Sequence, residues 1–294
     1  MDILQKCPIC NHSEFELFLK CEDFTSSHEQ FNLCKCLSCA LVFTNPRPDR
    51  DSLPIYYQSN QYISHTGKST GILDRIYLLA RNLTLRWKIN LIKKQKGNPI
   101  SILDYGCGTG AFLQASHRQG WKIAGLEPSP EARQKATKIT GINIADNLAE
   151  FNQKFDVITL WHVLEHVMDL NQTLTNLTAL LKEDGIIIIA VPNHDSYDAS
   201  FYKQHWAAYD VPRHLWHFTK TTMAALLQLS NLKIKYIKPM KLDAFYVSLL
   251  SEKYSLLNRT SVLSLLKGTI RAIISNQLAR SSKNYSSLIY IVTK

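Results

Sequence analysis

Four cysteines near the start of the sequence have the spacing of metal ligands. Cys7 and Cys10 form one C-x-x-C pair, Cys36 and Cys39 form a second, and 25 residues separate the pairs. Two such pairs can surround one zinc ion tetrahedrally, because each two-residue spacer lets a turn direct both sulfurs at the same metal. Four thiolates leave no open position for a substrate, so we expect a structural zinc in a small zinc ribbon whose intervening segments are short strands.

A glycine-rich loop follows an apolar stretch in the middle of the chain. Residues 100–110 read ISILDYGCGTG, a predicted strand that ends near an aspartate and runs into three alternating glycines. A predicted helix and a second strand, 122–126, come next, and Glu127 closes that strand. Strand, tight turn, helix and parallel strand open a doubly wound sheet, and an acid at this point is placed to hydrogen-bond the hydroxyls of a ribose. The sequence therefore predicts a nucleoside site.

Residues 162–166, HVLEH, match the H-x-x-E-H pattern with which some zinc peptidases hold their metal. A peptidase of that kind needs both histidines on one helical face and a further carboxylate ligand. The preceding FDVITL is a predicted strand, and helical periodicity begins near Val163 or later, so we do not favour a peptidase. The stretch belongs instead to the carboxyl edge of the sheet, where ligands bind in such folds.

From about residue 95 to the end, the chain resembles the class I S-adenosylmethionine-dependent methyltransferases. The family's first motif, Asp-x-Gly-x-Gly-x-Gly, is matched by Asp104, Gly106, Gly108 and Gly110. The resemblance implies an α/β fold with a doubly wound, seven-stranded, mostly parallel sheet, Rossmann-like and preceded here by the ribbon. It implies a methyltransferase with S-adenosylmethionine as cofactor. The implied cofactor-binding residues are those of the first motif, with Glu127, Asp146, Asn147, Trp161 and His162.

Methyl transfer needs alignment and, for acceptors that must lose a proton, a base. Histidine suits that task because its ordinary pKa of about 6.5 leaves much of it neutral near pH 7. We expect His166 to be the base, with His194 and His214 as the other candidates. Structural roles for these histidines, and a proximity mechanism without a base, remain open alternatives.

The elements divide the chain into three predicted parts. Residues 1–45 form the zinc ribbon, 46–96 a connector with a basic amphipathic helix, and 97–294 the cofactor-binding methyltransferase domain. Within the last part, residues from about 194 to 220 are dense in Tyr, Trp, His and Arg and are expected to form a lid over the acceptor.

Two further expectations concern single side chains. Arg213 in the lid is expected either to hold an anionic group, such as the diphosphate of a nucleotide sugar, or to close an aromatic loop. Tyr56, Tyr57 and Tyr62 are expected to fold back over the cofactor. The apolar face of the helix over 71–96 is expected to pack on the protein, with its basic face in solvent or on phosphates.

Composition limits the classes of function. The start of the chain has no pattern of a signal peptide, and the longest apolar run, 185–191, is far shorter than the roughly 20 residues of a membrane helix. We therefore expect a cytoplasmic protein without membrane insertion. The leading hypothesis is methylation of oxygen or carbon on a small molecule such as a sugar or nucleotide sugar.

If the protein is an enzyme, the alternative function is that of an RNA or DNA methyltransferase, suggested by the two basic helical segments and by the ribbon, since many zinc ribbons bind nucleic acid. The acidic balance of the ribbon argues against a nucleic acid partner. A protein that binds the cofactor without catalysis is a third class, and the sequence does not indicate the oligomeric state.

Overall fold

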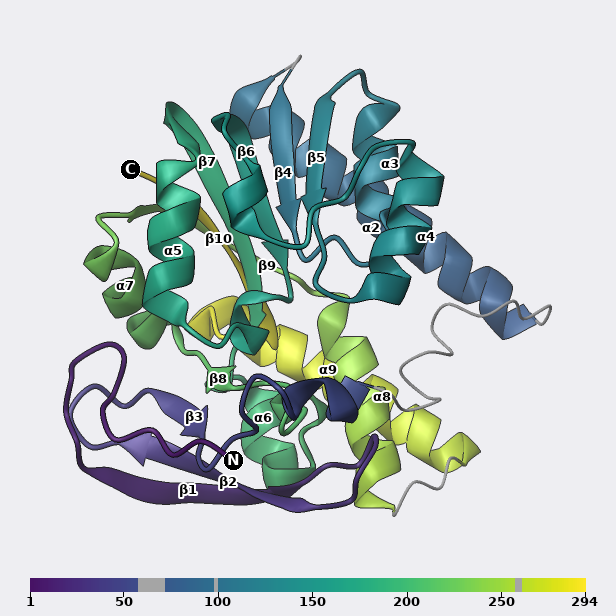
Figure 1. The fold of residues 1–294 in the computed structure, drawn as a ribbon. Coiled ribbons are helices and arrows are strands. Elements are labelled where there is room, and N and C mark those ends of the chain that lie inside the picture. Colours follow the sequence, from purple (N-terminus) through teal and green to yellow (C-terminus); the bar gives the residue numbers. More distant parts are fainter. Residues whose placement is uncertain (58–71, 98–99, 257–260) are drawn as a thin grey trace.

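The computed structural model describes residues 1–57, 72–97, 100–256 and 261–294. Its centre is a six-stranded sheet in the order β5-β4-β6-β7-β10-β9 (Figure 1). The strands from β5 to β7 run parallel, whereas β10 runs antiparallel to both of its neighbours. In chain order the strands are β4 Ser101–Tyr105, β5 Lys122–Leu126, β6 Phe155–Trp161, β7 Leu181–Pro192, β9 Lys233–Pro239 and β10 Ser287–Thr293.

Helices cover both faces of this sheet, as the doubly wound prediction requires. Along β7, Ile187 and Ile189 pack in one apolar cluster and Ile186 and Ile188 in another, because successive side chains of a strand point to opposite faces. The first cluster includes leucines of α5 and α7, and the second includes apolar residues of α2 and α3. The helices are α2 Ile72–Lys96, α3 Ala111–His117, α4 Pro130–Thr140, α5 Leu170–Ala179, α6 Tyr197–Tyr202, α7 Lys220–Leu229, α8 Asp243–Ser255 and α9 Val262–Ser282.

The family resemblance implies a seven-stranded sheet whose third strand in chain order is residues 143–148, but this segment is reduced to one parallel bridge. Ala145 pairs with Leu126 at the end of β5, and the chain then enters the 3-10 turn η2, Leu148–Glu150. Asn147 caps this turn through its side chain, which accepts a hydrogen bond from the Ala149 amide at 3.0 Å. Early capping ends the extended conformation, so the central sheet has six strands among the described residues, not the predicted seven. The Rossmann-like methyltransferase architecture is confirmed.

The apolar face expected for the long helix is only partly buried. Leu91 is buried on the sheet together with Ile89 and Ile92, but Leu83 and Trp87 are exposed, at 60% and 39% of their surface. Figure 1 shows α2 running on past the edge of the sheet, so the sheet supports only its C-terminal part. The side chains of residues 72–82 and the connector residue Tyr62 lie outside the described part of the chain.

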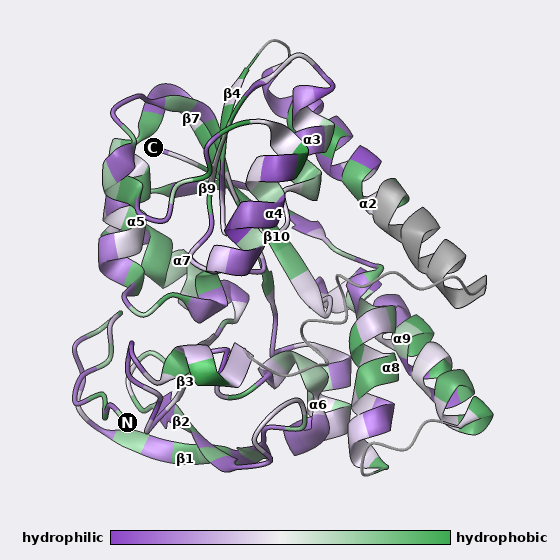
Figure 2. Ribbon diagram, turned by 45° about the vertical axis from the view of Figure 1, so that its right-hand side comes forward, coloured by the Kyte–Doolittle hydropathy of each residue, from purple (hydrophilic) through white to green (hydrophobic). Residues whose placement is uncertain are grey.

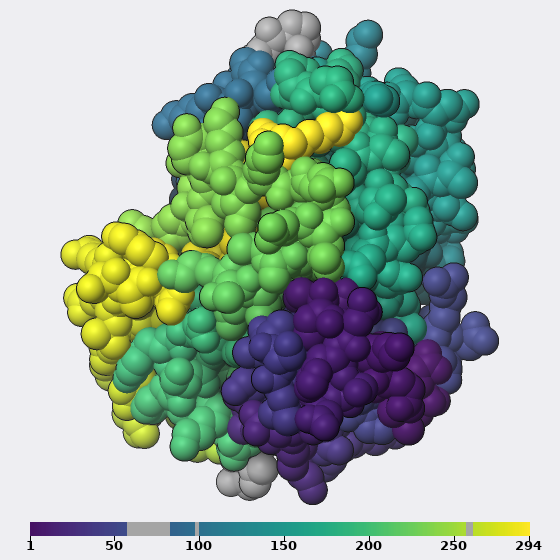
Figure 3. All heavy atoms as spheres, turned by 90° about the vertical axis from the view of Figure 1, so that its left-hand side faces the viewer, coloured from purple at the N-terminus to yellow at the C-terminus, as the bar shows by residue number. Residues whose placement is uncertain are grey.

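The ribbon forms a second sheet with the order β1-β2-β3-β8. The first three strands are antiparallel neighbours. The first two lie between the cysteine pairs, where the sequence predicted short strands, whereas β3 follows Cys39 and was not predicted. The fourth strand comes from the predicted lid, with His217 paired to Val42 and Trp216 to Phe43. Figure 3 shows the ribbon, in purple, in direct contact with the green part of the chain. The strands are β1 Phe15–Glu22, β2 Gln30–Cys36, β3 Val42–Thr44 and β8 Trp216–His217.

Among the described residues, no helix combines the length and the hydropathy that a membrane crossing requires.

Candidate active site

The glycine loop leaves β4 at the carboxyl edge of the sheet. Gly106, Gly108 and Gly110 have φ values of +74°, +54° and +80°, in the left-handed region that favours glycine. At Gly110 a Cβ would lie 2.9 Å from Cα of Ala136, so this glycine lets α3 approach α4. At Gly108 nothing lies within 4 Å of the Cβ position. The loop therefore presents an open backbone surface at its middle glycine.

Two acids flank this loop. Asp104 is buried and accepts a hydrogen bond from the Thr159 hydroxyl at 2.6 Å, and burial raises its pKa to about 7. Glu127 accepts hydrogen bonds from the Gly108 amide at 2.8 Å and the Ser129 amide at 2.9 Å. Burial also raises the pKa of Glu127. The position of Glu127 across the loop is the one that the sequence predicted for a ribose-binding acid.

The segment after the single bridge lies beside Glu127. The Glu127 amide donates to the Ala145 carbonyl at 2.9 Å, which brings the next residues to the same edge. Asp146 is exposed and forms an ion pair with Arg133 at 3.3 Å, and Asn147 caps η2. The structure thus brings Asp146 and Asn147 together with the loop, as expected for a wall of a nucleoside site.

Lys88 is a site residue that sequence reasoning missed. Its ammonium lies 4.1 Å from the centre of the Trp161 ring, and burial lowers its pKa to about 8 against the opposing effects of Asp104 and Asp243. The indole N–H of Trp161 is buried without a hydrogen-bond partner. In the sequence, Lys88 is part of the basic face of the helix, and that face is expected to lie in solvent or on phosphates, so the sequence does not mark Lys88 as a site residue.

These features fit S-adenosylmethionine. An open glycine cradle, a carboxylate for ribose hydroxyls and a buried cation for a carboxylate match the chemical groups of that molecule. The cofactor roles of the nine predicted residues remain predictions.

His162 follows β6 with a φ of +57°. Its Nε2 lies 2.8 Å from Asp243 and its Nδ1 3.3 Å from Glu165. Burial lowers the pKa of His162, but the two carboxylates outweigh it and raise the pKa to about 10. The residue is therefore an imidazolium near pH 7. The next turn, η3 (Leu164–His166), is a short 3-10 segment, so the two histidines of H-x-x-E-H do not share an α-helix.

His166, the last residue of this turn, forms a pair with His214. Their ring centres are 4.5 Å apart and nearly perpendicular. Nδ1 of His166 lies 3.0 Å from the carbonyl oxygen of Arg213 and 2.9 Å from the Tyr57 hydroxyl. Since a carbonyl can only accept, Nδ1 carries the proton and Nε2 keeps its lone pair. Burial, with His214, lowers the pKa of His166 to about 4, so the ring is neutral near pH 7.

His194 is placed differently from this pair. Its ring lies 5.8 Å from that of Phe18 in the ribbon, and burial lowers its pKa to about 4. Its Nε2 is buried without a partner. Of the three predicted base candidates, the structure brings two together and directs the third toward the ribbon.

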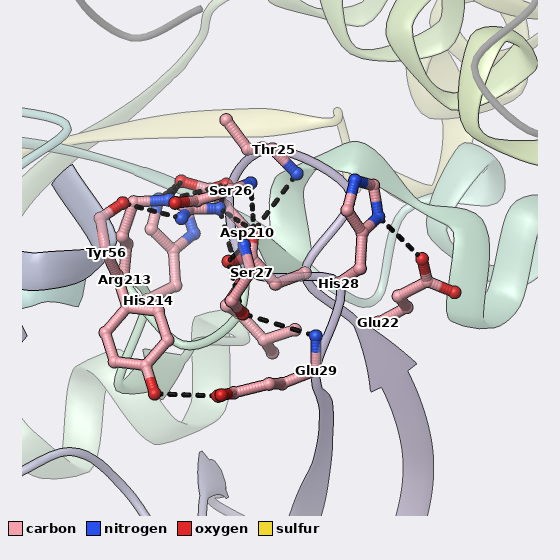
Figure 4. A network of polar contacts seen from close by, with 12 residues as sticks. Glu22, Thr25, Ser26, Ser27, His28, Glu29, Tyr56, Asp210, Arg213 and His214 are labelled. Atoms are coloured by element: carbon pink, nitrogen blue, oxygen red, sulfur yellow. Dashed lines mark hydrogen bonds and ion pairs between the residues drawn. The ribbon is translucent and has the colours of Figure 1, made fainter. Parts of the chain in front are cut away.

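Arg213 does not present its guanidinium to a ligand. The side chain is fully buried, with ion pairs to Asp23 at 2.8 Å and Asp210 at 2.7 Å and a hydrogen bond to the Tyr56 carbonyl at 3.0 Å (Figure 4). The expectation that it holds a diphosphate is wrong for this conformation, because these partners already occupy its donors. It joins the ribbon to the lid instead.

Within the part of the chain that the structure describes, two groups of His, Cys or acidic side chains could hold a cation. In the first, Cys7 and Cys39 have sulfurs 3.4 Å apart, Cys10 and Cys36 3.5 Å, and all four sulfurs lie within 4.8 Å of one another. A tetrahedral zinc would hold thiolates about 3.8 Å apart, so the donor set fits this metal. The second group, Glu165, His166 and His214, offers three ligand atoms within 4.8 Å.

Comparisons with known proteins agree with this geometry. A family model described as "Methyltransferase domain" matches residues 74–236. A ubiquinone biosynthesis O-methyltransferase of Pelagibacter ubique (strain HTCC1062) is 28% identical over 204 residues, which cover 64% of this chain and 82% of that protein. The enzyme of the same name from Vibrio vulnificus (strain YJ016) is 32% identical over 104 residues, 32% of this chain and 44% of its own length. Of several further relatives with this name the chain spans half or less.

The fold is also similar to that of a methyltransferase of known structure. Magnesium protoporphyrin IX methyltransferase from Synechocystis PCC 6803, with bound SAH, superposes with a TM-score of 0.54 and 13% sequence identity. The match covers 84% of this chain and all of that one.

Proposed function

The chain belongs to the class I S-adenosylmethionine-dependent methyltransferases, and from this membership we propose that it methylates a hydroxyl-bearing small molecule, a sugar or nucleotide sugar, at oxygen or carbon. One observation carries the proposal. The glycine loop with Glu127 and the pair His166 and His214 lie at the same carboxyl edge of the sheet, where the cofactor and acceptor sites of such folds meet.

We propose that the protein's own residues divide the work as follows. The glycine loop, Glu127, Asp146 and Asn147 hold the nucleoside, while Trp161, His162 and Lys88 line the opposite end. When bound, S-adenosylmethionine supplies an electrophilic methyl group on a sulfonium. His166 accepts the proton of the acceptor at Nε2, since its Nδ1–H is held by the Arg213 carbonyl. His214 and Tyr57 position this ring.

The ribbon is proposed to hold zinc on Cys7, Cys10, Cys36 and Cys39 as a structural metal. The pairing of β8 with β3 supports a role in shaping the lid, because the ribbon then supplies the frame for residues 213–217. We further propose that residues 1–45, 46–96 and 97–294 are the three structural parts of the chain, with strand β8 of the third part paired to β3 of the first. The enzyme is proposed to act in the cytoplasm.

The names of the relatives support O-methylation of a small molecule, although they point to an acceptor other than a sugar. The burial of Arg213 removes the contact expected for a diphosphate. The two acceptor classes, sugars and phenols, are therefore separated by experiment. The protein is incubated with methyl-labelled cofactor and either pools of sugars and nucleotide sugars or a set of catechol-type phenols. Label transfer only to phenols contradicts the sugar proposal and leaves the methyltransferase proposal intact.

The role of His166 has its own test. His166→Ala is expected to lower kcat by about 10²–10⁴-fold without weakening SAH binding, because the ring acts on the acceptor proton. His194→Ala is the matched control, since that histidine faces the ribbon, and it is expected to keep kcat within a few-fold. Turnover by His166→Ala close to that of the unmodified enzyme would remove this residue from the role of base.

Nucleic acid remains the alternative acceptor. A methyltransferase acting at cytosine C5 needs a nucleophilic cysteine, and Cys107 is the one cysteine of the sequence beyond the first 39 residues. Burial raises the pKa of the Cys107 thiol, which opposes that role. Tight RNA binding that falls steeply with salt would favour this alternative.

A further inference from the structure

Nearly all of the net charge lies in the last fifth of the chain. Residues 233–294 contain eleven Lys and Arg and two acids, whereas residues 1–232 contain 23 Lys and Arg and 22 acids. The +10 charge of the protein is therefore a local property of the segment that forms β9, α8, α9 and β10. Such a segment attracts anionic partners.

Helix α9 within this segment has the reverse of the usual amphipathic arrangement. Its buried positions are small residues, and its large apolar side chains face solvent. Val262 is 85% exposed and Leu266 is 56% exposed. The buried residues are Ser264, Gly268, Ala272, Ser275 and Ala279, and the exposed apolar ones are Val262, Leu263, Leu265, Leu266, Ile270, Ile273 and Leu278.

The small residues explain how α9 packs on the protein. A Cβ at Gly268 would lie 3.0 Å from Cα of Leu249, so the glycine allows a close approach of α9 to α8. The Ser275 hydroxyl donates to Asp198 at 2.7 Å and fixes the helix on α6. By contrast, α5 buries Leu170, Leu174 and Leu177, the ordinary pattern of a surface helix. The exposure of the apolar side of α9 thus follows from its packing.

This exposed stripe has basic neighbours. Lys267, Arg280 and Lys283 are exposed on the same helix or at its end, and α9 contains no acid. A hollow of about 360 Å³ lies beside the helix and is lined in part by Phe201, Lys267 and Arg271. Figure 2 shows green, apolar turns along α9, and Figure 3 shows the yellow C-terminal segment projecting at one edge of the molecule. Glu252 also lines this hollow but is buried, so the exposed charges on α9 itself are basic and favour contact with an anionic surface.

We propose that the α9 face, defined as the seven exposed apolar residues with Lys267, Arg280 and Lys283, docks the protein on an anionic phospholipid bilayer. Apolar side chains enter the boundary between headgroups and acyl chains, and the basic side chains contact lipid phosphates, as in interfacial amphipathic helices. The contact is peripheral, since it uses one face of a helix. It is independent of the acceptor that the enzyme methylates.

Two other occupants fit the face less well. A second copy of the chain would bring two strongly basic segments together, which like-charge repulsion opposes. A nucleic acid would use the basic residues but would leave the leucines and isoleucines without a partner, because its backbone is polar. An anionic bilayer satisfies both features together.

The test uses the full-length protein and vesicle co-sedimentation without cofactor or acceptor. Vesicles of phosphatidylcholine with phosphatidylglycerol are expected to bind the protein, pure phosphatidylcholine vesicles to bind it much less, and added salt to release it. Neutralising Lys267 and Arg280 with glutamine is expected to lower the partition constant about 25-fold, since each charge near the surface contributes roughly five-fold. Lys20→Gln with Lys122→Gln is the matched control and should have little effect.

The apolar half of the face is tested by Leu263→Glu with Leu266→Glu, which are exposed and should leave folding intact. This variant is expected to lose at least about ten-fold in vesicle binding. The control is Leu17→Glu with Leu229→Glu, two leucines of similar exposure elsewhere. The proposal is overturned if the unmodified protein ignores phosphatidylglycerol at low salt, or if the α9 variants bind as the controls do. It is also overturned if light scattering shows a dimer that the α9 variants dissociate. Methyl transfer in solution, measured separately, reports on the proposed function alone.

Discussion

The substitution Gly108→Ala is expected to weaken cofactor binding strongly while it lowers the stability of the fold only slightly. Gly108 has a φ of +54° and open space at its Cβ position, so alanine there meets no protein atom. The left-handed conformation costs a residue with a Cβ about 1 kcal/mol, and the hydrogen bond from the Gly108 amide to Glu127 is kept. We therefore expect a melting temperature lower by roughly 2–4 °C. The new methyl group fills the cradle, and SAH should bind at least about ten-fold more weakly, a loss of about 1.4 kcal/mol.

Gly120→Ala is the matched control for this experiment. Gly120 follows α3 with a φ of +77° and also has nothing within 4 Å of its Cβ position, so it carries the same conformational cost. Calorimetric titration with SAH and thermal melts are made on both variants. Gly120→Ala should melt like Gly108→Ala and bind SAH like the unmodified protein. Equal SAH affinity of the two variants would refute the assignment of the loop as the cofactor cradle.

Three further predictions concern stability, pH and metal. Asp23→Asn leaves the buried Arg213 with one carboxylate and should lower the free energy of unfolding by about 3 kcal/mol in urea titrations, whereas Glu16→Gln, at an exposed ion pair, should change it by less than about 0.5 kcal/mol. Burial holds the pKa values of His194 and His217 below their ordinary range, so their contribution to stability is complete above about pH 6.5 and declines as the pH falls toward 4. The raised pKa values of Asp104 and Glu127 act in the opposite direction, so the melting temperature is compared with that of His194→Ala, and an equal change with pH in the two proteins would contradict this prediction. Metal analysis should find one zinc ion per chain, which Cys36→Ser should lose and Glu165→Gln should keep. If the analysis finds a second zinc ion that Glu165→Gln removes, His166 is a metal ligand and not a base.

The parts of the molecule that depend on local patterns could be predicted from the sequence. Two C-x-x-C pairs bring four sulfurs together because each turn fixes its own pair, and one further strand pairing joins the two turns. The glycine loop could also be predicted from the sequence, since alternating glycines directly after a strand are typical of a tight turn beside a ligand. In both cases the chemistry is encoded within a few residues.

Contacts between distant segments could not be predicted in this way. A ligand contact and a structural role both remained open for Arg213, because the sequence does not show that Asp23, 190 residues earlier, lies beside it. The same holds for His162, whose strongest partner is Asp243 of α8, and for Lys88, which turns from the basic face of α2 toward Trp161. Periodicity indicates which side of a helix or strand is apolar. Whether a charged side chain points into the protein depends on a partner from a distant segment, and only the fold brings that partner close.

These contacts between distant segments show that the pair His166 and His214 and the glycine loop are held in place by different parts of the chain. Three of the contacts between the ribbon and the lid segment bear on the histidine pair: β3 pairs with β8, the Thr44 hydroxyl donates to the His214 carbonyl at 2.8 Å, and Asp23 binds Arg213. The carbonyl of Arg213 in turn accepts from His166. By contrast, the Gly108 amide and Glu127 are joined within the central sheet's own edge. If the ribbon unfolds, we therefore expect the lid to move and to displace His166 and His214. The cofactor loop should stay in place, because none of the three contacts reaches that loop.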